Sequence, residues 1–223
     1  MPNIIDVQQG TQEWFEHRRG VITATRAQAL FGRGDSNTKK GFGFGAKYLK
    51  KRDDAIAEIA MERLNHAGKP LVTGAALRRG HDFEEEAIEA YTVLTGQIVE
   101  PCGFALHSDF PQLGCSPDGL VGKDGMVQVK VPTSVRKHVE YLQTGFHAAE
   151  YGWQLFHELY VMDRKWTDIV SYCPEAGNGL QVAKWRVYAP NSWDAYHAMI
   201  CAADADIEEQ VKALSKIQTS KAA

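Results

Sequence analysis

The sequence has no long hydrophobic run. None of its apolar stretches approaches the roughly 20 residues that a membrane-spanning helix needs. The N-terminus also lacks the basic and then apolar stretch of a secretory signal. These absences predict a cytoplasmic protein with no membrane partner.

Cysteine is scarce as well. The chain has four cysteines, at positions 102, 115, 173 and 201, and no two of them form a CxxC pair. Structural zinc and iron–sulfur sites usually take their ligands from such closely spaced pairs. The spacing therefore argues against a site of either kind and favours reduced, structural thiols.

The chain also lacks the strong positive charge of a protein that coats nucleic acid, because its net charge is −3. Its basic residues are nevertheless concentrated. Residues 33–52 contain seven lysines and arginines and one aspartate, an excess of six positive charges. This segment would suit a polyanion, and a solvated lysine-rich loop is an equally good interpretation.

No internal repeat or long low-complexity linker divides the 223 residues, which predicts a single domain over residues 1–223. Apolar periodicity predicts helices at 11–19, 23–30, 48–64, 74–95 and 146–162 and a final helix that begins near 192. It predicts strands at 97–107, 119–121, 126–131, 167–173 and 180–188, and the glycine-rich segment 33–46 is predicted to be a mobile loop. Helices around a small central mixed sheet give an α/β (α+β) fold class.

One stretch combines residues that suit metal-dependent chemistry. Asp118 lies in a Ser-Pro-Asp-Gly turn before a short strand, and Gln128 and Lys130 share one face of the next strand because strand side chains alternate. A hairpin through residues 122–125 would place Asp118 beside position 128. Two carboxylates bind Mg²⁺, and a lysine can orient an attacking water, which together suit phosphodiester hydrolysis.

Taken alone, these residues have simpler explanations. The Ser-Pro-Asp-Gly segment is more often only a turn, and residues 127–131 are more often an amphipathic strand. One of the three glutamates at 84–86 could add a carboxylate from the 74–95 helix, although a solvated acidic face is an alternative. Tyr151 and Gln154 lie on one face of the 146–162 helix at i, i+3, where a surface glutamine is the commoner case.

Five motifs in order raise the metal-site interpretation above these alternatives. They are W-x3-R-x-G-V-I-T-A-T at 14–25, L-x2-G-x3-E at 77–84, C-S-P-D-G-L at 115–120, V-x-V-K-x-P at 127–132 and Y-x2-Q at 151–154. With them the chain resembles the lambda exonuclease or YqaJ-type viral recombinase branch of the PD-(D/E)xK nucleases. The resemblance covers close to two thirds of the chain and implies a restriction-endonuclease-like core.

The resemblance also implies roles for individual residues. Asp118 would bridge two Mg²⁺ ions, for which Mn²⁺ is a possible substitute, and Glu84 would bind one of them. Position 128 and the carbonyl of Val129 would bind the other. Further implied roles are activation of water by Lys130, support of the site by Gln154 and Tyr151, binding of a 5′-phosphate by Arg18, Thr25 and Ser116, separation of the terminal base pairs by Leu77, and a DNA-backbone contact by Arg136.

Gln128 departs from the family pattern, which has glutamate at this position. Glutamine has nearly the same shape, so the fold should persist, but the site loses one negative charge and a good Mg²⁺ ligand. We expect hydrolysis to be strongly impaired and DNA binding to persist. Two explanations compete, natural drift and a deliberate Glu-to-Gln change, and the intact remaining positions favour the second.

The implied function is a 5′→3′ exonuclease that digests one strand of linear duplex DNA and leaves a 3′ overhang for phage-type recombination. The resemblance further implies a homotrimeric ring around DNA, a single-strand annealing protein as partner, and a phage or prophage origin in a bacterial host. The alternatives are an endonuclease or repair nuclease of the same fold and a catalytically silent module that binds DNA ends.

Overall fold

The computed structural model describes residues 1–31, 46–65, 75–146 and 148–222, and of residues 46–50, 65, 75–78, 81, 148, 149, 221 and 222 it describes the backbone only. The predicted loop at 33–46 and most of the basic segment at 33–52 therefore lie outside the described residues. The helices are α1 (Gln12–His17), α2 (Ala24–Phe31), α3 (Ala46–Asn65), α4 (Ala75–Thr95), α5 (Val135–Thr144), α6 (Ala148–Met162) and α7 (Asp194–Ala222).

The strands form two mixed sheets. The first has the order β1 (Asn3–Ile5), β4 (Phe104–Leu106), β5 (Leu113–Cys115), β2 (Ile22–Thr23), and the second has the order β3 (Val99–Glu100), β6 (Gly119–Val121), β7 (Gly125–Lys130), β8 (Trp166–Tyr172), β9 (Val182–Tyr188). Each sheet contains one parallel pair, β2 with β5 and β7 with β8, and its other pairs are antiparallel. The expected central sheet is thus divided in two, and residues 116–118 connect its parts.

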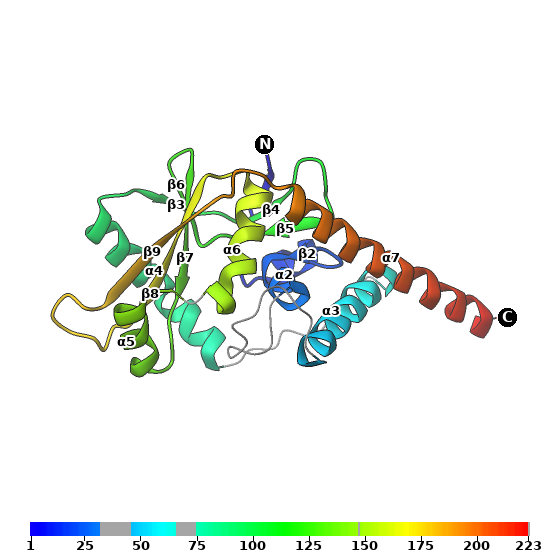
Figure 1. Ribbon diagram of the computed structural model, residues 1–223, viewed down its shortest axis with the longest axis horizontal. Helices are drawn as coiled ribbons and strands as arrows, with labels where there is room; N and C mark the ends of the chain where they lie inside the picture. The colour runs from blue at the N-terminus through cyan, green and yellow to red at the C-terminus, as the bar shows by residue number, and fades with distance from the viewer. Residues whose placement is uncertain (32–45, 66–74, 147, 223) are drawn as a thin grey trace.

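Helices cover both faces of the second sheet (Figure 1). On one face, Ala87 and Tyr91 of α4 pack against Val127 and Val129 of β7. On the other face, Met126 of β7 belongs to a larger core that it shares with α2, α3, α6 and α7. Since Met126, Gln128 and Lys130 alternate with the valines, the side chains at 128 and 130 point away from α4, as the sequence predicts.

Most of the predicted elements are confirmed. Thr11 caps α1 and accepts a hydrogen bond from the backbone N–H of Trp14, and α4 ends before Gly96, whose φ of 68° is in the left-handed region. The hairpin through 122–125 pairs Gly119 with Val127, and Gly122 supplies a φ of 55° in its turn.

The prediction of one strand over 97–107 was wrong. The segment forms β3 in one sheet and β4 in the other, with Pro101 between them. Proline has no N–H to donate to a sheet, so the ladder is interrupted there. Helix α5 was not predicted from the sequence at all, and neither were the short strands β1, β2 and β5.

The buried His157 connects helix α6 to helix α7 and to strand β5. His157 of α6 has no exposed surface, its Nδ1 is 2.8 Å from the hydroxyl of Tyr196 on α7, and its Nε2 is 3.2 Å from the carbonyl of Gly114 on β5. A neutral ring that donates from Nε2 to the carbonyl and accepts at Nδ1 satisfies both contacts. Burial lowers the pKa of His157 to about 4.

Replacing His157 with Gln is expected to flatten the acid side of the stability profile. The unfolded chain, in which a histidine pKa is near 6.5, takes up the proton first, so the free energy of unfolding of the parent falls as the pH drops from about 6.5 to about 4. The loss is on the order of 3 kcal/mol. Urea unfolding over this pH range measures the loss. If the free energy of unfolding fell equally steeply with pH in the parent and the variant, the lowered pKa of His157 would be contradicted.

No helix among the described residues is both long and apolar enough to cross a membrane.

Candidate active site

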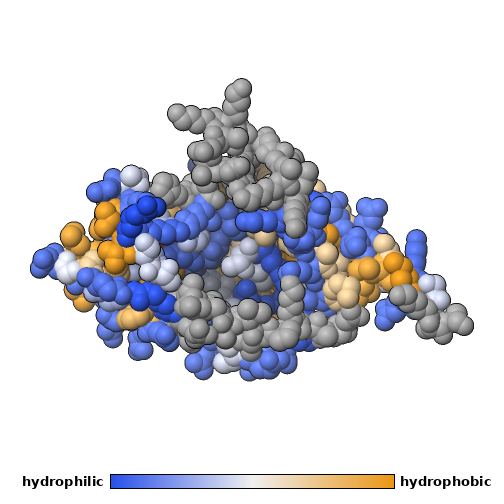
Figure 2. Space-filling view, turned by 90° about the horizontal axis from the view of Figure 1, so that it is seen from below, coloured by the Kyte–Doolittle hydropathy of each residue, from blue (hydrophilic) through white to orange (hydrophobic). Residues whose placement is uncertain are grey.

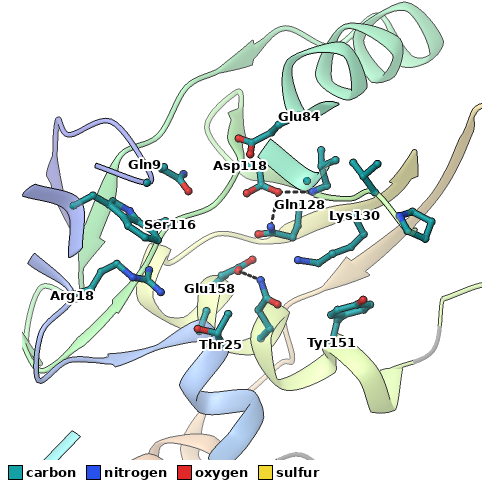
Figure 3. A pocket seen from close by; sticks show the side chains of 18 of the residues that line it. Gln9, Arg18, Thr25, Glu84, Ser116, Asp118, Gln128, Lys130, Tyr151 and Glu158 are labelled. Carbon is teal, nitrogen blue, oxygen red and sulfur yellow. Dashed lines mark hydrogen bonds between the residues drawn. The ribbon is translucent and has the colours of Figure 1, made fainter. Parts of the chain in front are cut away.

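A cleft of about 710 Å³ opens between the two sheets and the helices around them. The face shown in Figure 2 is hollowed near its middle, and the side chains around the hollow are mainly hydrophilic. Figure 3 shows side chains from separate parts of the chain converging on the cleft. The sequence-predicted residues that line it are Arg18, Thr25, Glu84, Ser116, Asp118, Gln128, Val129, Lys130, Tyr151 and Gln154.

Asp118 lies immediately before β6, at the end of the β6–β7 pair where Gly119 is opposite Val127. Its Oδ2 accepts hydrogen bonds from the backbone N–H of Val129 at 2.6 Å and from Nε2 of Gln128 at 2.5 Å. Burial raises the pKa of Asp118 above its usual range, while Lys130 and the two hydrogen bonds oppose the rise. The hairpin therefore brings Asp118 and position 128 together across adjacent strands, as the sequence predicts.

The amide of Gln128 is oriented by this contact. Because its Nε2 donates to Asp118, its Oε1 points elsewhere, and this buried oxygen has no hydrogen-bond partner among the described residues. A buried oxygen without a partner is costly unless a ligand satisfies it. The amide thus offers one free oxygen at the position where the resemblance implies a carboxylate.

Glu84 supplies a second carboxylate from α4 and points toward Asp118 (Figure 3). Burial, and then the negative charge of Asp118, raise the pKa of Glu84 to about 7, while Lys130 opposes the rise. The neighbouring Glu85 and Glu86 are exposed, and Glu86 accepts a hydrogen bond from Tyr172. Of the three glutamates, Glu84 is therefore the one that lines the cleft.

These oxygen atoms fit a hard divalent cation in kind. Mg²⁺ binds carboxylate, amide and carbonyl oxygens, and Asp118, Glu84 and Oε1 of Gln128 present such atoms to one cleft. In the described ranges no three His, Cys, Asp or Glu side chains gather closely enough to hold a metal. With glutamine at 128, the donor set consists of two carboxylates and one neutral amide oxygen.

Lys130 reaches the cleft from the same face of β7 as Gln128. Its Nζ lies 5.0 Å from the centre of the Tyr151 ring, which is within the range of a cation–π contact. Gln154, one turn along α6, donates from Nε2 to Oε1 of Glu158 at 2.9 Å. Tyr151 thus contacts Lys130, and Gln154 is buried beside Glu158, so neither is an ordinary helix-surface residue.

Arg18, Thr25 and Ser116 gather at the other end of the cleft. Figure 3 shows Arg18, Thr25 and Ser116 on the side opposite Tyr151. Thr25 lies in the first turn of α2, where backbone N–H groups have no partner within the helix and favour an anion. Two hydroxyls, a guanidinium and a helix N-terminus are groups that bind phosphate.

Leu77 and Arg136 are the other two residues that the sequence predicts for the site. The backbone of Leu77 lies in α4, but its side chain is outside the described residues. Arg136 does not line the cleft. It lies on α5 with 87% of its side chain exposed, and its Nε is 3.4 Å from Glu140.

Three of the cleft residues that the sequence did not predict as part of the site make contacts that bear on it. Gln9 donates from Nε2 to the carbonyls of Cys102 at 2.9 Å and Pro117 at 3.0 Å, and so fixes the segment that carries Ser116 and Asp118. Glu158 is almost fully buried, its Oε2 has no hydrogen-bond partner in the described part of the chain, and burial raises its pKa to about 8. Trp14 contacts both Arg18 and Ser116.

Two of the three had a local signal: Glu158 lies at i, i+4 from Gln154, and Trp14 lies four residues before Arg18 and begins the motif at 14–25. The contacts of Gln9 and Trp14 span about a hundred residues of sequence.

The order of elements and residues defines a restriction-endonuclease-like fold. An aspartate begins one strand, the next strand presents position 128 and a lysine to a cleft, and a preceding helix adds a glutamate. The family described as the YqaJ-like viral recombinase domain matches residues 13–168. The chain belongs to this family.

Solved structures agree with this assignment. The crystal structure of LHK-Exo in complex with dAMP is 29% identical in sequence, with a TM-score of 0.79 over 96% of this chain and 100% of that one. A structure of the alkaline exonuclease LHK-Exo from Laribacter hongkongensis gives a TM-score of 0.78 at the same identity and coverage. A phage-related exonuclease from Haemophilus somnus 129PT, at 13% identity and a TM-score of 0.65 over 88% of this chain and 96% of that one, shares the fold. No curated protein matches the sequence.

Proposed function

We propose that the chain is the scaffold of a Mg²⁺-dependent 5′→3′ exonuclease that acts on linear duplex DNA from a 5′-phosphorylated end and leaves a 3′ overhang. One observation carries the proposal. Arg18, Thr25 and Ser116, which suit a terminal phosphate, share a cleft with Asp118, Glu84 and Lys130, which suit hydrolysis of a phosphodiester. The 29% identity to LHK-Exo, which is named an exonuclease, supports it.

In this proposal each residue has a distinct task. When bound, Mg²⁺ supplies a Lewis acid and neutralises the charge that develops on the phosphate. Asp118, Glu84, position 128 and the carbonyl of Val129 would hold it. The amine of Lys130 orients the attacking water, and Tyr151 and Gln154 limit the positions that the amine can take. Arg18, Thr25 and Ser116 hold the end of the strand so that the next phosphodiester faces Asp118.

Gln128 explains why this chain is expected to be a poor catalyst. A neutral amide oxygen replaces a carboxylate, and the amide N–H already occupies one oxygen of Asp118. This hydrogen bond also favours a second candidate function, that of a module that binds DNA ends without cutting them. The cleft then keeps its phosphate-binding groups, while one carboxylate oxygen of Asp118 is occupied by the amide of Gln128.

The family resemblance alone supports three further parts of the proposal. They are a homotrimeric ring around the DNA, a single-strand annealing protein as partner, and a role in phage-type recombination in the bacterial cytoplasm. An endonuclease or repair nuclease of the same fold would not need a DNA end.

The requirement for an end tests the proposed activity directly. The Gln128→Glu protein is expected to digest linear duplex DNA in Mg²⁺, to release a 5′ label before a 3′ label, and to leave covalently closed circles intact. A 5′-phosphate is expected to increase the initial rate about tenfold over a 5′-hydroxyl, because charge-assisted hydrogen bonds to the terminal phosphate are lost without it. Cutting of circles at a rate similar to that of linear DNA would favour the endonuclease, and inactivity on all substrates would favour the binding module.

A further inference from the structure

Trp14 makes two directed contacts at the phosphate-binding end of the cleft. Its Nε1 donates a hydrogen bond to Oγ of Ser116 at 2.8 Å, and the guanidinium carbon of Arg18 lies 3.9 Å from its ring centre. Arg18 is the C-cap of α1, four residues after Trp14, whereas Ser116 is 102 residues from Trp14 in sequence. A single indole therefore connects two residues that suit the terminal phosphate.

The position of the indole is itself fixed. Phe15 packs edge-on against its ring, with ring centres 4.8 Å apart, and the Thr11 cap holds the first turn of α1. The ring also packs against the small core of Val7, Val21 and Phe104. Trp14 thus has little freedom to move when a ligand enters.

The hydrogen bond determines what Ser116 can do. An indole N–H is a donor only, so the hydroxyl oxygen of Ser116 must accept from it. The hydroxyl hydrogen remains available, and across the described ranges no acceptor takes it. Ser116 lines the cleft, so its hydroxyl can donate to an anion there. Without the indole, the same hydroxyl could rotate and present a lone pair to that anion.

The face of the Trp14 ring holds Arg18 and leaves its N–H donors available. Its guanidinium has no salt bridge or side-chain hydrogen bond to any described residue, and it is held by the ring of Trp14 and, at 5.9 Å, that of Phe104. Aromatic faces bind a guanidinium without using its N–H donors. Burial, and then the nearby Arg26, lower the pKa of Arg18 to about 10, which leaves it charged at neutral pH. The donors of Arg18 are therefore reserved for a ligand in the cleft.

A simpler explanation is that Trp14 is only a core residue. A core tryptophan usually donates its N–H to any nearby acceptor, often a backbone carbonyl, and serves mainly to fill space. Here the donor is directed to a side chain in the cleft, and the ring face is covered by a cation that also lines the cleft. Both polar contacts of Trp14 thus involve cleft residues.

We propose that Trp14 is a positioning residue for the terminal 5′-phosphate, because it orients the hydroxyl of Ser116 and the guanidinium of Arg18 as donors into the cleft. The inference rests on the proposed function and adds to it the residue that sets preference for the phosphate. Trp14 itself need not touch the DNA.

Binding measurements on the chain with Gln128 test this without digestion. Fluorescence anisotropy in Ca²⁺ would compare short blunt duplexes that carry a 5′-phosphate or a 5′-hydroxyl. Trp14→Phe keeps an aromatic ring and removes the N–H, and is expected to raise the Kd for the phosphorylated duplex about fivefold. Trp14→Leu also removes the ring face and should raise it more than about tenfold. The Kd for the hydroxyl duplex should change less than about twofold in both.

Two controls separate positioning from general damage. In a Ser116→Ala background, Trp14→Phe should not weaken binding of the phosphorylated duplex any further, because the two changes remove the same hydrogen bond. Trp166→Phe is a matched control, since Trp166 holds Arg186 at 3.5 Å in the same kind of stack but does not line the cleft. It should leave both Kd values unchanged.

The possible failures are distinguishable. If the parent chain prefers the 5′-phosphate but Trp14→Phe weakens both duplexes equally, or neither, the positioning role is wrong and the proposed function stands. If the parent binds both duplexes equally, phosphate recognition by this cleft is wrong, and the role of Trp14 falls with it.

Discussion

Replacing Gln128 with Glu is expected to raise the rate of Mg²⁺-dependent digestion of linear duplex DNA by about 100-fold or more, since a well-held cation contributes several kcal/mol to the transition state. The change places a carboxylate at the buried position where an amide oxygen now has no partner among the described residues. It also removes the N–H that now occupies Oδ2 of Asp118. Both effects strengthen binding of a divalent cation between positions 118 and 128.

Initial rates of nucleotide release from a 5′-phosphorylated duplex measure this effect, with Ca²⁺ as a cation that should not support hydrolysis. Gln143→Glu is a matched control, because it adds the same charge at an exposed position of α5 that does not line the cleft. Calorimetric titration with Mg²⁺ provides a readout independent of turnover. Equal Mg²⁺ affinity and equal rates in the parent and Gln128→Glu would show that position 128 is not part of a cation site.

Replacing Asp168 with Ala is expected to lower the free energy of unfolding by about 3 kcal/mol. Asp168 of β8 is fully buried, and it accepts hydrogen bonds from Arg186 at 2.7 and 2.8 Å, from Tyr91 at 2.8 Å and from Lys184 at 3.4 Å. These partners hold the pKa of Asp168 below its usual range despite burial. Its stabilising contribution is therefore present above the unfolded pKa and is lost as the pH falls through the lower, folded pKa.

Urea unfolding at neutral pH measures the loss. Arg186 is about one-third exposed and stacks on Trp166, so it can turn to water when Asp168 is removed. The double variant Asp168→Ala with Arg186→Met should therefore lose less than the sum of the single losses. A loss below about 0.5 kcal/mol for Asp168→Ala would place it among ordinary surface substitutions and contradict its role.

The same carboxylate also bears on the candidate active site. Tyr91, which donates to Asp168, is seven residues beyond Glu84 and so lies on the same side of α4. Asp168 pairs with Val127 in the register between β7 and β8, one residue before Gln128. The contact between Tyr91 and Asp168 thus holds the helix that carries Glu84 against the strands that carry Gln128 and Lys130.

Local periodicity explains what could be predicted from the sequence. Gln128 and Lys130 share a face because a strand alternates, and the hairpin turn placed Asp118 beside them. Their neighbour Glu84 lies seven residues after Leu77, so spacing placed it on the buried edge of its helix, and the family resemblance assigned it to the metal site. The contacts of Trp14 with Ser116 and of Gln9 with Pro117 depend on the tertiary fold, and no local pattern indicates them.

Helix α5 shows why local pattern can also fail. Its apolar residues Val135, Val139 and Leu142 are exposed, whereas His138 and Tyr141 are buried. His138 compensates for burial with contacts to the hydroxyl of Ser171 at 2.9 Å and the carbonyl of Leu180 at 2.8 Å. The polar and apolar faces are thus exchanged relative to the usual pattern of a surface helix. The strands β1, β2 and β5 have only two or three residues, too few for alternation to be seen.

The segment that joins the two sheets has a consequence for the size of the product. Ser116, at the phosphate-binding end, and Asp118, at the hydrolytic end, are separated by Pro117 alone, and Gln9 ties the carbonyl of Pro117 to the fold. Proline restricts the backbone at its own position and at the residue before it. In the proposed reaction, the distance from the site that binds the 5′-phosphate to the site of hydrolysis is therefore fixed by this short, restrained segment of the chain. Each turnover would therefore remove a fragment of constant length, whatever the base sequence of the DNA.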